Sequence, residues 1–245
     1  MLTASSSHPY TIATPSFKMS TNIFSIDSYL LLTNSKYKIP QIGFGVYESP
    51  PETCVASCKK AFEAGYRHID TAQYYANETE VGKALAESGL SRNDVYITSK
   101  ILSPGEDVES TYQKIVESVE KLAGKDGYVD LFLIHSPNGG AKARKLMWLA
   151  QERAQKEGKV RDIGVSNYGI QHIEEIKSFG KVWPPVVNQI EVCKSCSFKA
   201  DVLITERSSI PGANSARPSR TARRTTSSSK HTARSSAIKR PKARH

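Results

Sequence analysis

Four side chains of the sequence have the chemical types that proton transfer to a carbonyl oxygen needs: Asp70, Tyr75, Lys100 and His135. A tyrosine with an ordinary pKa of about 10 is a poor acid at neutral pH, but a neighbouring ammonium group favours the phenolate and lowers that pKa. Lys100 could supply the ammonium, and Asp70 could keep it charged. A histidine beside the phenol could orient the carbonyl group. The set predicts a proton-donating tyrosine, provided that the fold gathers these residues.

Elements far apart in the sequence must position these side chains. Six short segments rich in β-branched residues have the length and composition of buried strands. They are GFGVY (43–47), YRHIDTA (66–72), VYITSK (95–100), VDLFLIH (129–135), VRDIGVSN (160–167) and VVNQIEV (186–192). Helical stretches separate them, one from Glu106 to a stop at Gly124 and another after Asn77, whose spacing to Glu80 matches a capping box. The alternation predicts a parallel sheet covered by helices, either a doubly wound sheet or a (β/α) barrel.

The polar candidates lie at or near the carboxyl ends of these predicted strands. Taken alone, each has an ordinary structural explanation. Asp70 could cap a helix, Lys100 could be a solvated strand end, and His135 could be a hydrogen-bonded core histidine. Ser166 and Asn167 could form a turn. In a barrel, however, the carboxyl ends of the strands converge on one mouth, where catalytic groups gather, so the set together predicts a site there.

Five motifs follow one another along the chain: GYRHIDTAQYYANETEVGKAL (65–85), ITSK (97–100), LFLIHSP (131–137), GVSNY (164–168) and VNQIEV (187–192). In order and spacing they resemble the aldo-keto reductases, especially their fungal and plant-like members. The resemblance implies an α/β fold, a (β/α)8 TIM barrel of which about six of the eight strands fall within residues 23–193. It also implies reduction of an aldehyde or ketone by hydride transfer from NADPH.

The same resemblance implies roles for individual residues. Tyr75 becomes the proton donor, Lys100 and Asp70 the pair that tunes it, and His135 the residue that orients the substrate. Tyr74 becomes a pocket or packing residue. The implied cofactor-binding residues are Ser166, Asn167 and Gln189, on the nicotinamide carboxamide, together with Val46. The implied substrate pocket is lined by Tyr47, Leu102 and Ser136.

The net charge of +10 is concentrated at one end of the chain. Residues 1–193 carry 21 Lys and Arg against 22 Asp and Glu, whereas residues 194–245 carry 13 against 2. This basic Ser/Arg-rich tail is poor in apolar side chains, so we expect it to be disordered. It could bind phosphates through charge, but Phe198 is its single aromatic residue, so any nucleic-acid binding is expected to be non-specific.

The composition of the chain limits which other classes of protein it could belong to. Residues 1–22 lack the apolar region of a secretory signal, and we expect a disordered leader. No apolar run approaches the 18 or so residues of a membrane span. The cysteines are Cys54, Cys58, Cys193 and Cys196, with no histidine close by, so we expect no metal site and a reducing, cytoplasmic environment.

After Val192 the sequence departs from the family's pattern. A family member would continue into a seventh strand with an AYxPL motif and an eighth with the loop that holds the adenosine phosphate. Read one base out of frame, permitted codons for residues 220–236 spell YCxxHDFLIEAYCPLV, which resembles that seventh-strand segment. We therefore expect the region 194–245 to be out of frame, through a retained intron or a frameshift, and the chain as written to be inactive. Sequencing the spliced transcript tests this.

Two alternatives come from other functional classes. A barrel can serve as a non-catalytic binding or regulatory subunit, because a fold does not fix a function. The presence of Asp70, Tyr75, Lys100 and His135 counts against that alternative. The second is non-specific nucleic-acid binding through the basic tail.

Overall fold

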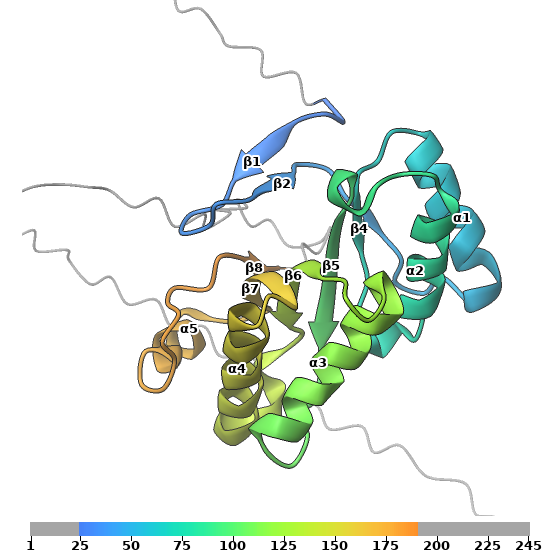
Figure 1. Ribbon diagram of the computed structural model, residues 1–245. Coiled ribbons are helices and arrows are strands. Elements are labelled where there is room, and N and C mark those ends of the chain that lie inside the picture. Colours follow the sequence, from blue (N-terminus) through green and yellow to red (C-terminus); the bar gives the residue numbers. More distant parts are fainter. Residues whose placement is uncertain (1–24, 191–245) are drawn as a thin grey trace, which may run out of the picture. The chain divides into compact units, whose positions relative to one another are not determined.

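Six parallel strands form the central sheet of the computed structural model, which describes residues 25–190 (Figure 1). They are β3 (Phe44–Gly45), β4 (His68–Asp70), β5 (Tyr96–Ile101), β6 (Val129–Ile134), β7 (Val160–Ser166) and β8 (Asn188–Gln189). Each strand pairs with the next along the chain, whereas a doubly wound sheet reverses its order at a switch point. The sheet curls into a half-barrel, so the prediction of an incomplete (β/α)8 barrel is confirmed. The expected leader and basic tail lie outside the described residues.

Helices follow the strands in the described part of the chain. They are α1 (Pro51–Glu63), α2 (Glu78–Glu87), α3 (Val108–Ala123), α4 (Gly140–Lys156) and α5 (Ile170–Ile176). Helix α3 begins where Asp107 and Ser110 form a capping box, and it ends at Gly124, whose φ of 80° suits a residue without Cβ. Its buried stripe includes Ile115 and Val119, which pack against the sheet layer.

An antiparallel hairpin precedes the sheet and was not among the elements predicted from the sequence. It consists of β1 (Tyr29–Leu31) and β2 (Lys38–Pro40), with Leu30 opposite Ile39. The hairpin is attached to the sheet by the Ser35 hydroxyl, which donates to Asp162 at 2.7 Å, and by Ile39, which packs against the sheet interior. Each strand has three residues, and those of β1 are all exposed, so the alternation is too short for a sequence signal.

Apolar side chains cover both faces of the sheet. Strands β5 and β6 are buried along their whole length, as expected for a parallel sheet. Along β5, Ile97 faces the helices, whereas Tyr96 faces the inside of the curl with Leu131 and Leu133 of β6. Because side chains alternate along a strand, this register decides that Lys100 also points inward, on the face of Tyr96.

His68 makes stability depend on pH in a defined direction. Burial lowers the pKa of its imidazole to about 4, against the opposing effect of Asp70 and Asp130, and its Nε2 lies 2.9 Å from the Thr98 hydroxyl. A histidine held neutral in the fold takes up a proton on unfolding. The free energy of unfolding is therefore highest above the unfolded pKa of about 6.5 and decreases as pH falls from there to about 4. We expect this residue alone to account for a loss of about 3 kcal/mol between pH 7 and pH 4.

Urea unfolding of the 245-residue chain across that pH range measures the effect. The variant His68→Gln, which cannot ionise, should have a lower stability at pH 7 and a shallower fall toward pH 4. The control is His172→Gln, which removes the imidazole of a partly exposed histidine of α5. An unchanged slope in His68→Gln would contradict the assignment.

Candidate active site

Lys100 occupies the centre of a polar cluster at the carboxyl ends of the strands. Its ammonium group donates to Asp70 Oδ1 at 2.5 Å, to the Thr71 carbonyl at 3.0 Å and to the Tyr75 hydroxyl at 3.4 Å. These three acceptors match the three donors of an ammonium group. Two of the other three residues expected to carry the chemistry, Asp70 and Tyr75, therefore contact the Lys100 nitrogen.

Strand register fixes the ion pair between Lys100 and Asp70. The Lys100 side chain is 2% exposed and that of Asp70 is 17% exposed. A buried ammonium group is costly without a partner, and Asp70, at the end of the neighbouring strand β4, supplies the charge. Asp70 lies opposite Thr98 of β5, two residues before Lys100 on the same face. A slip of one residue would place Lys100 on the helix side and break the pair.

Tyr75 ends a 3-10 turn, η1 (Gln73–Tyr75), which follows β4. Its ring centroid lies 5.6 Å from that of His135 and 5.0 Å from that of Tyr47. Tyr74, one residue earlier, is 63% exposed and meets the His135 ring edge-on at 6.1 Å. The turn therefore directs Tyr75 to Lys100 and leaves Tyr74 at the surface.

His135 follows β6 directly and completes the cluster. Its backbone N–H donates to the Ile101 carbonyl at 2.9 Å, which continues the pairing of β5 and β6 past the end of β6. This pairing holds the imidazole at the mouth, nearly perpendicular to the Tyr75 ring at 80°. A carbonyl group that approached the Tyr75 hydroxyl would also meet the imidazole. Asp70 and Lys100 lie in β4 and β5, whereas Tyr75 and His135 follow β4 and β6, and these three strands are adjacent in the sheet.

The residues assigned to the nicotinamide lie at the ends of β7 and β8. The Ser166 hydroxyl and the Asn167 backbone N–H both donate to the Gln189 carbonyl at 2.9 Å. The Gln189 side chain donates through Nε2 to Asp70 Oδ2 at 2.9 Å, so it reaches the same carboxylate as Lys100. Amide and hydroxyl groups of this kind can recognise a carboxamide, and in this respect they fit the nicotinamide end of a dinucleotide.

Val46 follows β3, and its side chain is buried in the core at 1% exposure. Its backbone N–H donates to the Asp70 carbonyl at 3.0 Å, and its carbonyl accepts from Asn77 Nδ2 at 2.9 Å. Val46 therefore belongs to the framework beneath the cluster, and its apolar side chain is turned away from the mouth.

The residues assigned to the substrate pocket lie around the cluster and differ in the surface that they offer to a bound molecule. Tyr47 is 59% exposed, and its ring lies beside that of Tyr75. Leu102 is 39% exposed and follows the end of β5. Ser136 follows His135, and its hydroxyl accepts from the Asn138 backbone N–H at 3.2 Å. Tyr47 and Leu102 offer apolar surface to a bound molecule, while Ser136 begins a short turn.

Asn77 has a different role from the one expected. It precedes α2 but caps the helix with no side-chain hydrogen bond, so the predicted capping box is wrong. Its side-chain Oδ1 accepts from the Thr71 hydroxyl at 2.7 Å, and its side-chain Nδ2 donates to the carbonyls of Val46 and Ser49. This fully buried amide therefore ties the end of β4 to the loop after β3. The competing acceptors lie in distant segments, which local spacing does not reveal.

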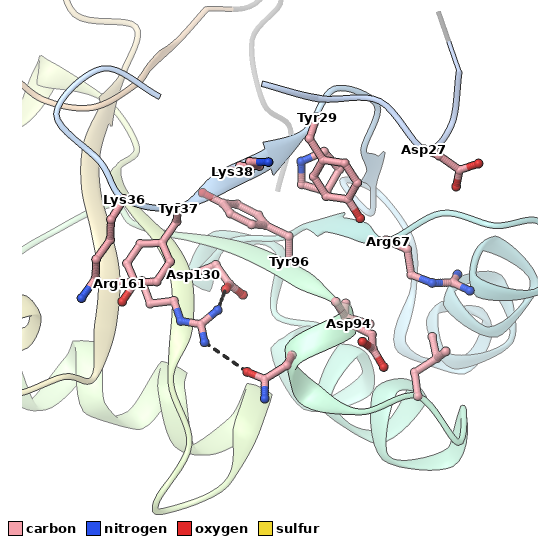
Figure 2. A pocket seen from close by; sticks show the side chains of 14 residues that line it. Asp27, Tyr29, Lys36, Tyr37, Lys38, Arg67, Asp94, Tyr96, Asp130 and Arg161 are labelled. Atoms are coloured by element: carbon pink, nitrogen blue, oxygen red, sulfur yellow. Dashed lines mark hydrogen bonds and ion pairs between the residues drawn. The ribbon is translucent and has the colours of Figure 1, made fainter. Parts of the chain in front are cut away.

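A cavity of about 650 Å³ lies at the amino ends of the strands, away from this cluster (Figure 2). It lies between the hairpin residues Tyr29 and Lys38 and the starts of β5 to β7, which contribute Tyr96, Asp130 and Arg161. Arg161 bonds Asp130 at 2.9 Å and Asn93 at 3.1 Å, so the guanidinium group and the Asp130 carboxylate are paired within the wall. None of the residues assigned to catalysis or cofactor binding lines it.

Residues 25–190 also bear on metal binding and membrane insertion. This part of the chain contains no group of three or more His, Cys, Asp or Glu side chains that could hold a metal ion. None of its helices has the length and apolar character that crossing a membrane requires. Cys54 and Cys58 lie buried one turn apart in α1 as free thiols. Cys193 and Cys196 lie outside the described residues.

Curated relatives and solved structures place this chain among known proteins. It is 41% identical over 165 residues to an uncharacterized oxidoreductase of Schizosaccharomyces pombe, a match that covers 66% of this chain and 56% of the relative. It is 39% identical over 155 residues to the glyoxal reductase of Bacillus subtilis, covering 63% of this chain and 54% of that protein. The chain thus spans little more than half the length of these relatives.

The solved structures include an aldo/keto reductase from Brucella melitensis, 40% identical, with a TM-score of 0.62 over 67% of this chain and 63% of that one. An aldo-keto reductase from Bombyx mori in complex with NADP is 32% identical, with a TM-score of 0.60 over 67% of this chain and 58% of that one. The family model described as "Aldo/keto reductase family" matches residues 41–200, which contain the whole polar cluster. The chain therefore belongs to the aldo/keto reductase family.

Proposed function

We propose that the polar cluster is the site of an NADPH-dependent carbonyl reductase in which Tyr75 donates a proton to the carbonyl oxygen of an aldehyde or ketone. The observation that carries the proposal is the chain of contacts from Asp70 through Lys100 to the Tyr75 hydroxyl, at 2.5 and 3.4 Å. An ammonium group beside a phenol makes the phenol a stronger acid. General acid catalysis of this kind contributes about 10²- to 10⁴-fold to a rate.

Each residue of the cluster has a part in the proposed reaction. When bound, NADPH would supply a hydride to the carbonyl carbon and would become NADP⁺. Tyr75 gives its proton to the carbonyl oxygen, and Lys100 stabilises the phenolate that remains. Asp70 keeps Lys100 charged in its buried position. His135 orients the carbonyl oxygen toward the Tyr75 hydroxyl.

The proposed cofactor and substrate class are supported by the relatives and by the side chains around the cluster. The Bombyx mori relative is a complex with NADP, and the Bacillus subtilis relative is named for glyoxal, a small dialdehyde. Ser166, Asn167 and Gln189 would hold the carboxamide of the nicotinamide, while Tyr47 and Leu102 would border the substrate. The free buried thiols Cys54 and Cys58 support a reducing compartment, and we place the protein in the cytoplasm.

We expect the 245-residue chain to lack reductase activity. The described cluster supplies amide and hydroxyl partners for the nicotinamide, and its one ammonium group, on Lys100, is bound to Asp70. Charge-assisted contacts to phosphates contribute about 1.5–3 kcal/mol each, so a dinucleotide held by its nicotinamide end alone should bind weakly. The test compares this chain with a chimera that joins residues 1–190 to the segment following the matched region in the Schizosaccharomyces pombe relative.

Oxidation of NADPH in the presence of glyoxal is the measurement, with circular dichroism to verify folding. The chimera should turn over, and the 245-residue chain should not. A folded but inactive chimera would reject the reductase proposal. Equal turnover by both proteins would show that the 245-residue chain already holds the whole cofactor site.

A further inference from the structure

Glu78 is a buried carboxyl group that the proposed proton transfer does not use. It is the first residue of α2, three residues after Tyr75, and it is only 4% exposed. We infer that Glu78 is a positioning residue that holds the Tyr75 turn against the strand that carries Lys100. The inference rests on the proposed function, because the position of Tyr75 affects catalysis only if Tyr75 is the proton donor.

The carboxyl group of Glu78 joins three elements through hydroxyl groups. The Ser99 hydroxyl of β5 donates to Glu78 Oε1 at 2.5 Å, and the Ser118 hydroxyl of α3 donates to Oε2 at 3.1 Å. Ser118 in turn accepts from Gln73 Nε2 at 2.9 Å. Gln73 also donates to the Lys114 carbonyl at 2.9 Å. A continuous network thus runs from η1 through α3 and α2 to β5.

The network supports the Tyr75–Lys100 pair from the helix side of the sheet. Ser99 immediately precedes Lys100, and because side chains alternate along a strand, Ser99 faces the helices while Lys100 faces the mouth. Gln73 and Glu78 lie two residues before and three residues after Tyr75. The backbone on both sides of the tyrosine is therefore connected, through Ser118 and Ser99, to the strand that positions the ammonium group. Movement of the turn would change the 3.4 Å separation directly.

The backbone of the turn gives a reason why such a connection is needed. Ala76 has φ 54° and ψ 30°, the left-handed region that a residue with a Cβ adopts at a cost. This conformation reverses the chain between Tyr75, which points to the mouth, and Glu78, which points into the helix layer. A strained residue persists only where its surroundings determine it. Within the turn, the Tyr75 and Ala76 N–H groups bond the Ala72 and Gln73 carbonyls at 3.0 and 3.2 Å.

The hydrogen-bond directions indicate which substitution should preserve the connection. Both hydroxyl groups donate to Glu78, an arrangement that suits a carboxylate. Burial raises the pKa of Glu78, and the bonds from Ser99 and Ser118 act against that rise. A glutamine could accept from Ser99 and donate to Ser118, whose own hydrogen could turn to the Lys114 carbonyl at 3.3 Å. Leucine would fill the space with no hydrogen bond, so Glu78→Gln and Glu78→Leu form a matched pair.

Hydrogen exchange in the 245-residue chain tests the connection independently of any reaction. In Glu78→Leu, the amides of Tyr75 and Ala76 should exchange about tenfold faster than in the wild type, whereas Glu78→Gln should stay near the wild type. The control is Gln151→Leu, which removes a fully buried polar group that bonds Phe132 in another part of the core. If Glu78→Leu does not fold, Ser99→Ala removes one donor and should give about fivefold faster exchange.

Kinetics of the chimera test the positioning itself. Glu78→Leu should lower kcat by about 10- to 100-fold with KM within about threefold, and Glu78→Gln should restore most of kcat. Exchange of the turn that is no faster in Glu78→Leu than in Gln151→Leu would overturn the inference, and so would an unchanged kcat. If the wild-type chimera has no activity, the proposed function fails, and the exchange data still decide whether Glu78 holds the turn.

Discussion

Tyr75→Phe is expected to lower the kcat of the chimera by about 10²-fold or more while the affinity for NADPH stays within about twofold. The substitution removes only the hydroxyl group, which lies 3.4 Å from Lys100 Nζ, and it keeps the ring that packs against His135 and Tyr47. The proposed proton donor is then missing, whereas the groups proposed to hold the nicotinamide are intact. Steady-state kinetics with glyoxal and cofactor titration by tryptophan fluorescence measure the two quantities separately.

Tyr74→Phe is the matched control for this experiment. Tyr74 is the neighbouring tyrosine, also near the His135 ring, but it is 63% exposed. It should keep kcat within about twofold, because it is not placed to donate to a carbonyl group beside Lys100. Near-wild-type turnover by Tyr75→Phe would reject Tyr75 as the acid, and loss of activity in Tyr74→Phe alone would transfer the role to its neighbour.

Lys100→Met should be as damaging as loss of the tyrosine, for an electrostatic reason. The ammonium group lowers the free energy of the phenolate, so its removal makes Tyr75 a weaker acid. The variant should lose about 10²-fold or more in kcat, and the fall of kcat at alkaline pH should move to higher pH. It also leaves Asp70, whose side chain is 17% exposed, with the hydrogen bond from Gln189 Nε2 at 2.9 Å in place of its ion pair.

The pH profile of kcat is the decisive measurement for Lys100. Lys145→Met, at an exposed lysine of α4, controls for loss of one positive charge and should leave both rate and profile unchanged. Urea unfolding should show Lys100→Met to be less stable, since it breaks a largely buried ion pair. A variant with the wild-type profile would contradict the tuning role, whatever its stability.

The order of strands and the placement of the cluster could be predicted because both depend on local patterns. Each strand is a short apolar run, and Asp70, Lys100 and His135 each fall at or beside the end of one. Parallel strands bring their carboxyl ends to one edge, so the residues that share this edge follow from the sequence alone. The pairing of Lys100 with Asp70 needs only that the two strands be neighbours in register.

The contacts that local patterns cannot predict are those between distant polar groups. Gln189 reaches Asp70 from 119 residues further along the chain, and this contact depends on how far the sheet curls. Asn77 was predicted to cap a helix, but buried carbonyls of the loop after β3 compete for its amide. From the sequence, Glu78 would be expected to be an exposed charge at the start of a helix, where acidic residues are common. Its burial depends on Ser99 and Ser118, hydroxyl groups from two other elements.

The central claim is that the cluster around Tyr75 and Lys100 supports reduction of a carbonyl group. It is tested most directly by incubating the chimera with glyoxal and NADPH that carries deuterium at both C4 positions, followed by mass spectrometry of the product. The account predicts an alcohol that contains one deuterium on carbon, formed by the chimera and at least 10²-fold more slowly by its Tyr75→Phe variant. A folded chimera that yields no alcohol, or an alcohol without deuterium, would contradict it.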